Sequence, residues 1–110
     1  MKGENLGEFE EVVLLTIAAL LNEAYSVAIC DHIEEMTNRK VKLGVVHAVL
    51  NRMEKKGYIQ SELGAPTKER GGKRKRFFNI SHAGKVALMN SKEQRDRLLN
   101  VITESIFNGI

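Results

Sequence analysis

The sequence predicts a mainly α-helical domain with a small β-hairpin, followed by a long C-terminal helix that mediates dimerisation. Two observations predict the domain. Apolar residues recur at helical spacing in three successive segments, and two strand-like runs then flank a loop that contains Gly71-Gly72. A third observation predicts the long helix, because a serine-capped segment near the C-terminus is apolar at both ends and polar between them. We expect residues 1–80 to form the domain and residues 81–110 the dimerisation helix.

Length and composition are those of one soluble globular domain. A chain of 110 residues buries a modest core without disulfides, and its 43% hydrophobic and 28% charged residues are ordinary values. A single cysteine excludes an internal disulfide, so a reducing cytoplasm fits best. The acidic N-terminus and the short apolar run 12–21 predict neither a signal peptide nor a membrane span, which needs about 20 apolar residues.

The net charge of +3 conceals a strong segregation of charge along the chain. Residues 1–37 hold one basic and eight acidic side chains, whereas residues 38–76 hold twelve basic and three acidic ones. Six of these positive charges lie between Lys68 and Arg76. Clustered Lys and Arg bind polyanions, of which nucleic acid is the simplest in a cell, although a basic run alone is also typical of a solvated loop.

The first two helices supply the core and a contact surface. Glu8 to Leu21 forms the first helix, and its second half is apolar all the way round, which requires cover on two sides. The domain core covers one side, and a second subunit can cover the other. A second helix, capped by Ser26, extends to about Thr37. Its predicted buried stripe consists of Val27, Ile29, Cys30, Ile33 and Met36.

The third helix is the best candidate for reading a base sequence. It extends from about Leu43 to Lys56, and Gly57 supplies a left-handed stop. Its inward face consists of Val46, Leu50 and Met53. The opposite face carries Gly44, His47, Ala48, Asn51 and Lys55. Because its small residues keep the backbone accessible, this face can sink into a major groove. An ordinary exposed helix face is the alternative.

Two predicted strands follow the third helix, at Tyr58–Leu63 and Arg74–Ile80. We expect Ile59, Phe78 and Ile80 to face the core. The long loop between the strands contains half of the basic residues of this run and supplies the turn glycines. Three helices followed by a hairpin with a basic tip predict a winged helix-turn-helix domain.

The last segment predicts an arm that leaves its own domain. Ser81 caps a helix that extends from His82 to about Phe107, and its middle, Asn90–Arg97, is polar on every side. Two solvated turns between apolar patches favour contact with a second subunit in a two-fold dimer. A break near Asn90 that returns the helix to its own core is the alternative. The predicted dimer interface consists of Phe9, Val13, Leu98, Leu99, Ile102, Ile106 and Phe107.

Several linked motifs extend through most of the chain. Gly7-Glu8-Phe9-Glu10 opens the first helix, and Ala24-Tyr25-Ser26-Val27-Ala28-Ile29 opens the second. The third helix ends in Arg52-Met53-Glu54-Lys55-Lys56-Gly57-Tyr58-Ile59. Gly71-Gly72-Lys73-Arg74-Lys75-Arg76-Phe77-Phe78 then leads to Ala83-Gly84. In this order, over about residues 7–107, the motifs resemble the PadR family of bacterial transcriptional regulators, particularly its short members.

The resemblance implies a homodimeric winged-helix protein that binds an inverted-repeat operator, usually to repress transcription. It also implies that the third helix enters the major groove while the wing follows the neighbouring backbone or minor groove. His47 stands where the family most often has Tyr, which puts the usual base preference in question. Phe78 stands where the second aromatic is usually Tyr, and His82 replaces a frequent Pro.

Some members of the family hold flat aromatic ligands between their subunits. The resemblance therefore leaves room for a small-molecule effector at the dimer interface, in a pocket lined by Phe9, Val13, Leu99 and Ile102. The alternative is that these four residues are plain dimer core. No cofactor or metal is expected.

Two sets of side chains are predicted to contact DNA. Base preference is assigned to Gly44, His47, Ala48 and Asn51. Among these, Asn51 is the best candidate for direct readout, because an amide pairs well with adenine. Phosphate contacts are assigned to Lys42, Arg52, Lys55, Lys68, Arg70, Lys73, Arg74, Lys75 and Arg76. Such a regulator is expected in the cytoplasm, associated with the nucleoid.

Other functional classes fit the sequence less well. His32, His47 and His82 fall in three different elements without metal-ligand spacing, and no catalytic triad or phosphate-binding glycine motif is present, so no enzymatic activity is expected. The main alternative is a winged helix used for protein contacts, or an effector-sensing adaptor with only nonspecific DNA binding. It predicts an acidic partner and no palindromic site. RNA binding is disfavoured, because the basic strands lack an exposed aromatic platform.

Overall fold

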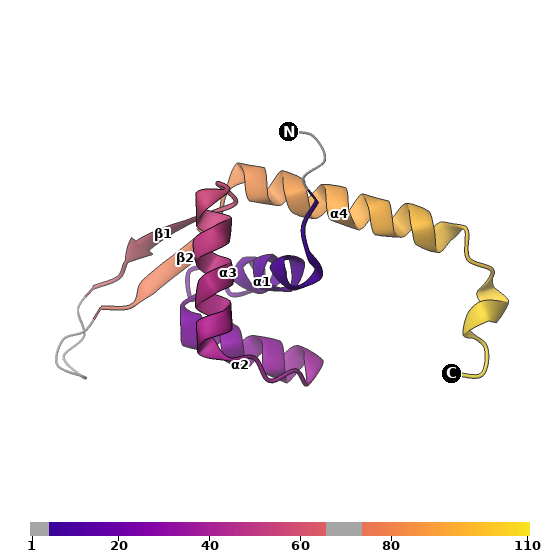
Figure 1. Ribbon diagram of the computed structural model, residues 1–110, viewed down its shortest axis with the longest axis horizontal. Coiled ribbons are helices and arrows are strands. Elements are labelled where there is room, and N and C mark those ends of the chain that lie inside the picture. The colour runs from indigo at the N-terminus through magenta and orange to yellow at the C-terminus, as the bar shows by residue number, and fades with distance from the viewer. Residues whose placement is uncertain (1–4, 66–73) are drawn as a thin grey trace.

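The computed structural model describes residues 5–65 and 74–110. Its elements are α1 (Glu8–Ala19), α2 (Ser26–Thr37), α3 (Leu43–Lys55), β1 (Ile59–Leu63), β2 (Arg76–Ile80), α4 (His82–Asn100) and a 3₁₀ helix (Glu104–Phe107). In Figure 1 the first three helices gather beside the hairpin, and α4 extends well beyond them. The chain measures 57 × 36 × 21 Å. This is the predicted winged helix-turn-helix followed by a long helix.

The core lies where α1, α2 and α3 meet the base of the hairpin. Each helix contributes apolar residues spaced three or four positions apart, which place one stripe against its neighbours. The predicted inward face of α3 is confirmed, because Val46, Leu50 and Met53 are exposed by no more than 1%. The other large core residues are Val13, Leu14, Ile17, Ile29, Ile33, Val49, Ile59 and Phe78.

The start of α2 differs from the prediction. Tyr25 is the N-cap residue and Ser26 is the first helical residue, so the predicted serine cap is wrong. The Ser26 hydroxyl contacts a side chain of α3 instead. The buried stripe of α2 is also narrower than predicted, because neighbouring elements cover Ile29 and Ile33 but leave Val27 and Met36 largely exposed.

The hairpin is antiparallel and is attached to the helices at its base. Ile59 pairs with Ile80 and Ser61 with Phe78. The Phe78 N–H also donates a hydrogen bond of 2.9 Å to the carbonyl of Ala24, in the link between α1 and α2. Gly57 ends α3 as predicted, with a φ of +83° that favours glycine. The strands begin one and two residues later than predicted.

The C-terminal helix begins as predicted and ends early. The Ser81 hydroxyl accepts a hydrogen bond of 3.1 Å from the Gly84 N–H, which caps α4. The helix is continuous past Asn90 but ends at Asn100, so its predicted extension to Phe107 is wrong. Residues 101–103 are β-branched and exposed, and this combination disfavours a helix that packs against nothing in its own chain.

Candidate nucleic-acid interface

The structure places the predicted reading face of α3 at the surface. Gly44, His47, Ala48 and Asn51 are all exposed, as are the flanking Lys42 and Lys55. A Cβ atom added to Gly44 would meet nothing within 4 Å, so another molecule can approach the backbone there. Val49, which borders this face, is 4% exposed and belongs to the core. The small and hydrogen-bonding residues thus form one open surface over a fully buried apolar stripe.

His47 is held by a residue that the sequence analysis did not assign to this face. Its Nε2 atom lies 2.9 Å from the Oγ atom of Ser26, on the first turn of α2. This contact orients the imidazole, and the second ring nitrogen, Nδ1, can then bind another partner. Ser26 was interpreted as a helix cap, and the spacing between positions 26 and 47 carries no signal that predicts their contact.

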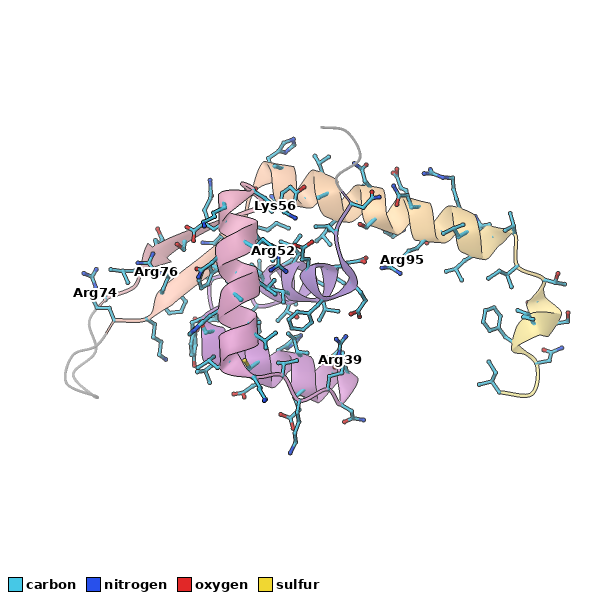
Figure 2. The ribbon with its side chains drawn as sticks, in the orientation of Figure 1. Arg39, Arg52, Lys56, Arg74, Arg76 and Arg95 are labelled. Carbon is cyan, nitrogen blue, oxygen red and sulfur yellow. The ribbon has the colours of Figure 1, made fainter. Side chains whose placement is uncertain are left out.

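The described part of the wing carries three cations, each with a contact that restricts it. Arg74 Nε donates a hydrogen bond of 2.8 Å to the Gly64 carbonyl, and Arg76 Nη1 donates one of 3.0 Å to Ser61 Oγ. The ammonium of Lys75 lies 4.1 Å from the centre of the Tyr25 ring. Figure 2 shows Arg74 and Arg76 on the hairpin, on the side of the molecule away from the C-terminal end of α4. The predicted wing contacts Lys68, Arg70 and Lys73 lie outside the described residues.

Arg52 has a role that the sequence analysis did not foresee. Its Nε atom lies 3.0 Å from a carboxylate oxygen of Glu10 on α1, and Lys56 Nζ lies 3.3 Å from the same oxygen. The Arg52 side chain is 51% exposed, so part of it remains at the surface. Arg52 therefore joins α3 to α1 in addition to its predicted phosphate contact.

Glu10 is the charged group with the least exposure in this region, at 6%. Besides its two cations, it accepts a hydrogen bond of 2.9 Å from the Gly7 N–H at the start of α1. Burial raises the pKa of the Glu10 carboxyl, but the Gly7 N–H, Arg52 and Lys56 outweigh burial and hold the pKa below its ordinary value. The carboxylate is therefore ionised at neutral pH.

Two neighbouring carboxylates of the same helical turn also bind cations from other elements. Glu8 pairs with Arg39, from the link between α2 and α3, at 2.8 Å. Glu11 accepts hydrogen bonds from Arg95 of α4, including one of 3.2 Å from Nε. We call Glu8, Glu10 and Glu11 the acidic turn. Its position at a helix N-terminus also favours negative charge.

The predicted dimer residues fall into two groups. Leu98, Leu99, Ile102, Ile106 and Phe107 are exposed in the single chain and so remain available to a partner. Val13 is fully buried in the core of its own chain, so its assignment to the interface is wrong.

Phe9, the remaining predicted interface residue, is half-buried, with the Arg39 guanidinium 5.4 Å from its ring centre. It therefore already packs within its own chain.

A groove of about 830 Å³ lies between α1 and α4. Its apolar lining includes Leu15, Leu21, Leu88, Met89 and Leu99. Of the four residues predicted to line an effector pocket, only Leu99 lines this groove. Val13 faces the core of its own chain and Phe9 packs against Arg39, so these two residues do not line an open pocket in the single chain.

Within residues 5–65 and 74–110, no cluster of three or more His, Cys, Asp or Glu side chains is arranged to hold a metal ion. None of the helices in this part of the chain combines the length and the apolar character that a membrane span requires.

The three-helix body, the hairpin and the open face of α3 together define a winged-helix protein of the DNA-binding kind. The sequence profile of the family described as "Transcriptional regulator PadR-like family" matches residues 14–90. This match covers more than half of the chain, which therefore belongs to the PadR-like family of transcriptional regulators. The resemblance inferred from the motifs is confirmed. Family membership implies regulation through DNA binding and not enzymatic catalysis.

Solved structures support the fold. A PadR-like transcriptional regulator from Bacillus cereus gives a TM-score of 0.71 at 20% identity, over 93% of both chains. A PadR family regulator from Clostridium difficile gives 0.69 at 22% identity, over 84% of this chain and 93% of the other. A transcriptional regulator from Clostridium thermocellum gives 0.65 at 24% identity, over 91% and 90%. Among curated proteins, no match was found.

Proposed function

We propose that this protein is a homodimeric repressor that binds an inverted-repeat operator through α3. The observation that carries the proposal is the α3 surface, where Gly44, His47, Ala48 and Asn51 are exposed together above a buried apolar stripe. Such a face approaches base edges closely, and Lys42 and Lys55 place positive charge at its two ends. Occupancy of the operator would then block transcription from the adjoining promoter.

Base readout falls to the exposed residues of α3. The Asn51 amide has the donor and acceptor geometry that suits adenine. Ser26 engages one ring nitrogen of His47, so the other nitrogen is the one presented to a base edge. Gly44 and Ala48 contribute by their small size, because a larger side chain would hold the helix away from the groove.

Phosphate contacts fall to the cations around this face and on the wing. The set comprises Lys42, Arg52, Lys55, Lys68, Arg70, Lys73, Arg74, Lys75 and Arg76. Two copies of this set would neutralise about 6–10 phosphates and give a slope of log affinity against log salt of roughly −5 to −9. Titration of a duplex at several salt concentrations measures this slope. A nearly flat salt dependence would exclude the proposal.

Dimerisation is supported by the apolar surface that the single chain leaves open. The groove between α1 and α4 has an apolar lining, and the segment 98–107 adds exposed apolar residues, of which Leu99 belongs to both surfaces. A second copy in a two-fold arrangement would cover both. Residues 1–80 then act as the DNA-binding domain, residues 81–110 as the dimerisation helix, and the protein works in the cytoplasm at the nucleoid. A small-molecule effector would bind at the interface between the two copies.

The test is a selection of duplexes from a random pool by the purified protein at moderate salt. Recovery of an inverted repeat is the expected result. Recovery of no motif, with binding that only weakens as salt rises, would contradict the proposal. The alternative of a protein-contact module with nonspecific DNA affinity would then be favoured, and an acidic partner would be sought.

A further inference from the structure

The acidic turn is where the recognition helix and the proposed dimer arm attach to the same piece of α1. Arg52 of α3 and Lys56, the C-cap residue of α3, bind Glu10, and Arg95 of α4 binds the adjacent Glu11. In Figure 2, Arg52 and Lys56 lie along α3 and Arg95 lies below α4, with the start of α1 between them. One helical turn therefore fixes two elements that have different tasks.

The ion pairs of Glu10 differ from surface ion pairs because the carboxylate is buried. Its side chain is 8% exposed, and it receives three donors: the Gly7 N–H, Arg52 Nε and Lys56 Nζ. Desolvation offsets much of the attraction in such a pair, so an apolar residue of similar size often gives equal stability. Apolar packing does not fix direction in this way. The Gly7 N–H holds the carboxylate on α1, and the two hydrogen bonds from Arg52 and Lys56 then restrict how α3 can slide or rotate on α1. The contact is therefore better suited to orientation than to stability.

Because of the position of Arg52, the contact with Glu10 also determines where the reading face of α3 lies. Arg52 follows Asn51 directly and lies one turn after Ala48, so a shift at Arg52 moves the exposed residues of α3 with it. On the other side, Arg95 lies in the middle of α4, between the domain and the exposed apolar end. In a two-fold dimer, the separation of the two α3 helices depends on the angle between α3 and α4 within each copy.

We propose that Glu10 is a positioning residue for operator binding, which fixes α3 relative to the dimer arm and so sets the half-site spacing that the dimer accepts. The proposal rests on the proposed function. It assigns Glu10 no contact with DNA. Glu10 acts through Arg52 and Lys56. Its loss should therefore change the half-site spacing that the dimer accepts, and not the general electrostatic attraction between protein and DNA.

The test compares the wild-type protein with Glu10→Gln, which keeps the size and the ability to hydrogen-bond but removes the charge. The probes are the selected inverted repeat, the same repeat with its spacer one base pair longer or shorter, and a scrambled duplex of equal length. We expect Glu10→Gln to bind the selected repeat about tenfold more weakly relative to the scrambled duplex, within the range of coupled contacts. The preference for one spacer length should also largely disappear.

Glu8→Gln is the matched control. Glu8 lies in the same turn and also pairs with an arginine, but its side chain is 62% exposed, so the pair is solvent-screened. This variant should keep both the affinity and the spacer preference of the wild type. A general effect of losing one negative charge near the DNA would instead appear equally in both variants.

Circular dichroism at the assay temperature establishes that each variant is folded. If Glu10→Gln does not fold, Glu10→Asp is the second variant that tests the proposal. Aspartate keeps the charge but is one methylene shorter, so it cannot reach all three donors at once, and a smaller change in the same direction is expected. A folded variant with wild-type spacer preference would overturn the proposal. If the wild type itself recovers no motif, the proposed function fails first and this inference fails with it.

Discussion

Asn51 and Arg74 separate the two kinds of DNA contact at the scale of single residues. In the proposed function the amide of Asn51 reads a base, so Asn51→Ala should remove about 1–3 kcal/mol of discrimination per half-site at one base position. Arg74→Ala should weaken all duplexes about equally, and Arg74→Lys, which keeps the charge, should not. Competition binding with a panel of single-base operator variants measures both effects. Equal losses at every base for Asn51→Ala would show that Asn51 does not read sequence.

Glu10 also gives the fold a dependence on pH. Its pKa lies below the ordinary value of 4.5, so the unfolded chain binds this proton more readily than the folded chain. The stabilisation is complete above the ordinary pKa and is lost as pH falls through the lower folded-state pKa. We expect the wild type to lose stability faster than Glu10→Gln as the pH is lowered below about 4.5. Urea unfolding at several pH values measures the two slopes, and identical slopes would contradict this assignment.

At the residue scale, sequence reasoning identified exposed groups better than buried polar ones. The exposed face of α3 follows from helical periodicity alone, because its apolar positions Val46, Leu50 and Met53 fix which side is buried. Glu10 was counted only as an N-terminal acid, since no local pattern indicates that a carboxylate will be covered by side chains more than 40 positions later. The contact between Ser26 and His47 was missed for the same reason.

At the element scale, two glycines in helices should respond oppositely to alanine. A Cβ atom on Gly84 would collide with the Tyr58 carbonyl and lie 2.8 Å from Ile80 Cγ1, so Gly84→Ala should destabilise the fold by about 1–3 kcal/mol as α4 is displaced. Gly44→Ala meets no neighbour and should stabilise α3 by about 0.5 kcal/mol. Midpoints of urea unfolding give both values. An unchanged midpoint for Gly84→Ala would show that α4 adjusts without cost.

Gly44→Ala also separates stability from binding. The added methyl group stands on the proposed DNA-facing surface, so this variant should bind the operator more weakly although its fold is more stable.

The limits of α4 show why helix ends are harder to predict than helix faces. Its start was predicted because the Ser81 cap is a local signal. Its end was misplaced by seven residues, at Phe107 instead of Asn100, because apolar residues at helical spacing continue into a stretch that has no packing partner in its own chain. A helix requires such packing when β-branched residues lower its propensity.

At the scale of the whole molecule, we expect the exposed end of α4 to govern the proposed self-association. Leu99 is 53% exposed and lines the groove between α1 and α4. Leu99→Lys would place a charge in the proposed interface, and should weaken dimerisation by about tenfold or more. Asn90→Lys adds the same charge to the polar middle of α4 and should leave the dimer intact. Sedimentation velocity over a range of concentrations compares the two, and a dimeric Leu99→Lys variant would exclude this interface.

The partner surface could be predicted from sequence only in part. The apolar side chains near the C-terminus were expected to extend away from the domain, because one short domain offers them no cover. All five that were assigned to the interface there are exposed in the single chain, namely Leu98, Leu99, Ile102, Ile106 and Phe107, and their contact with a second copy stays a prediction. Val13 was wrongly added, since a helix that is apolar all round does not reveal which of its sides faces the core and which faces outward. Periodicity gives no answer where every position is apolar.

The hydrogen bond from the Phe78 N–H to Ala24 bears on the thermodynamics of association. It ties the base of the wing to the link that precedes α2, so the hairpin and the helices approach a duplex as one preassembled body. A wing that had to find its place after the helix had docked would lose rotational freedom at that moment, and this loss would subtract from affinity. Here the base of the wing is ordered during folding, so encounter with DNA is expected to require little rearrangement of the protein and to proceed at a rate set mainly by electrostatic attraction.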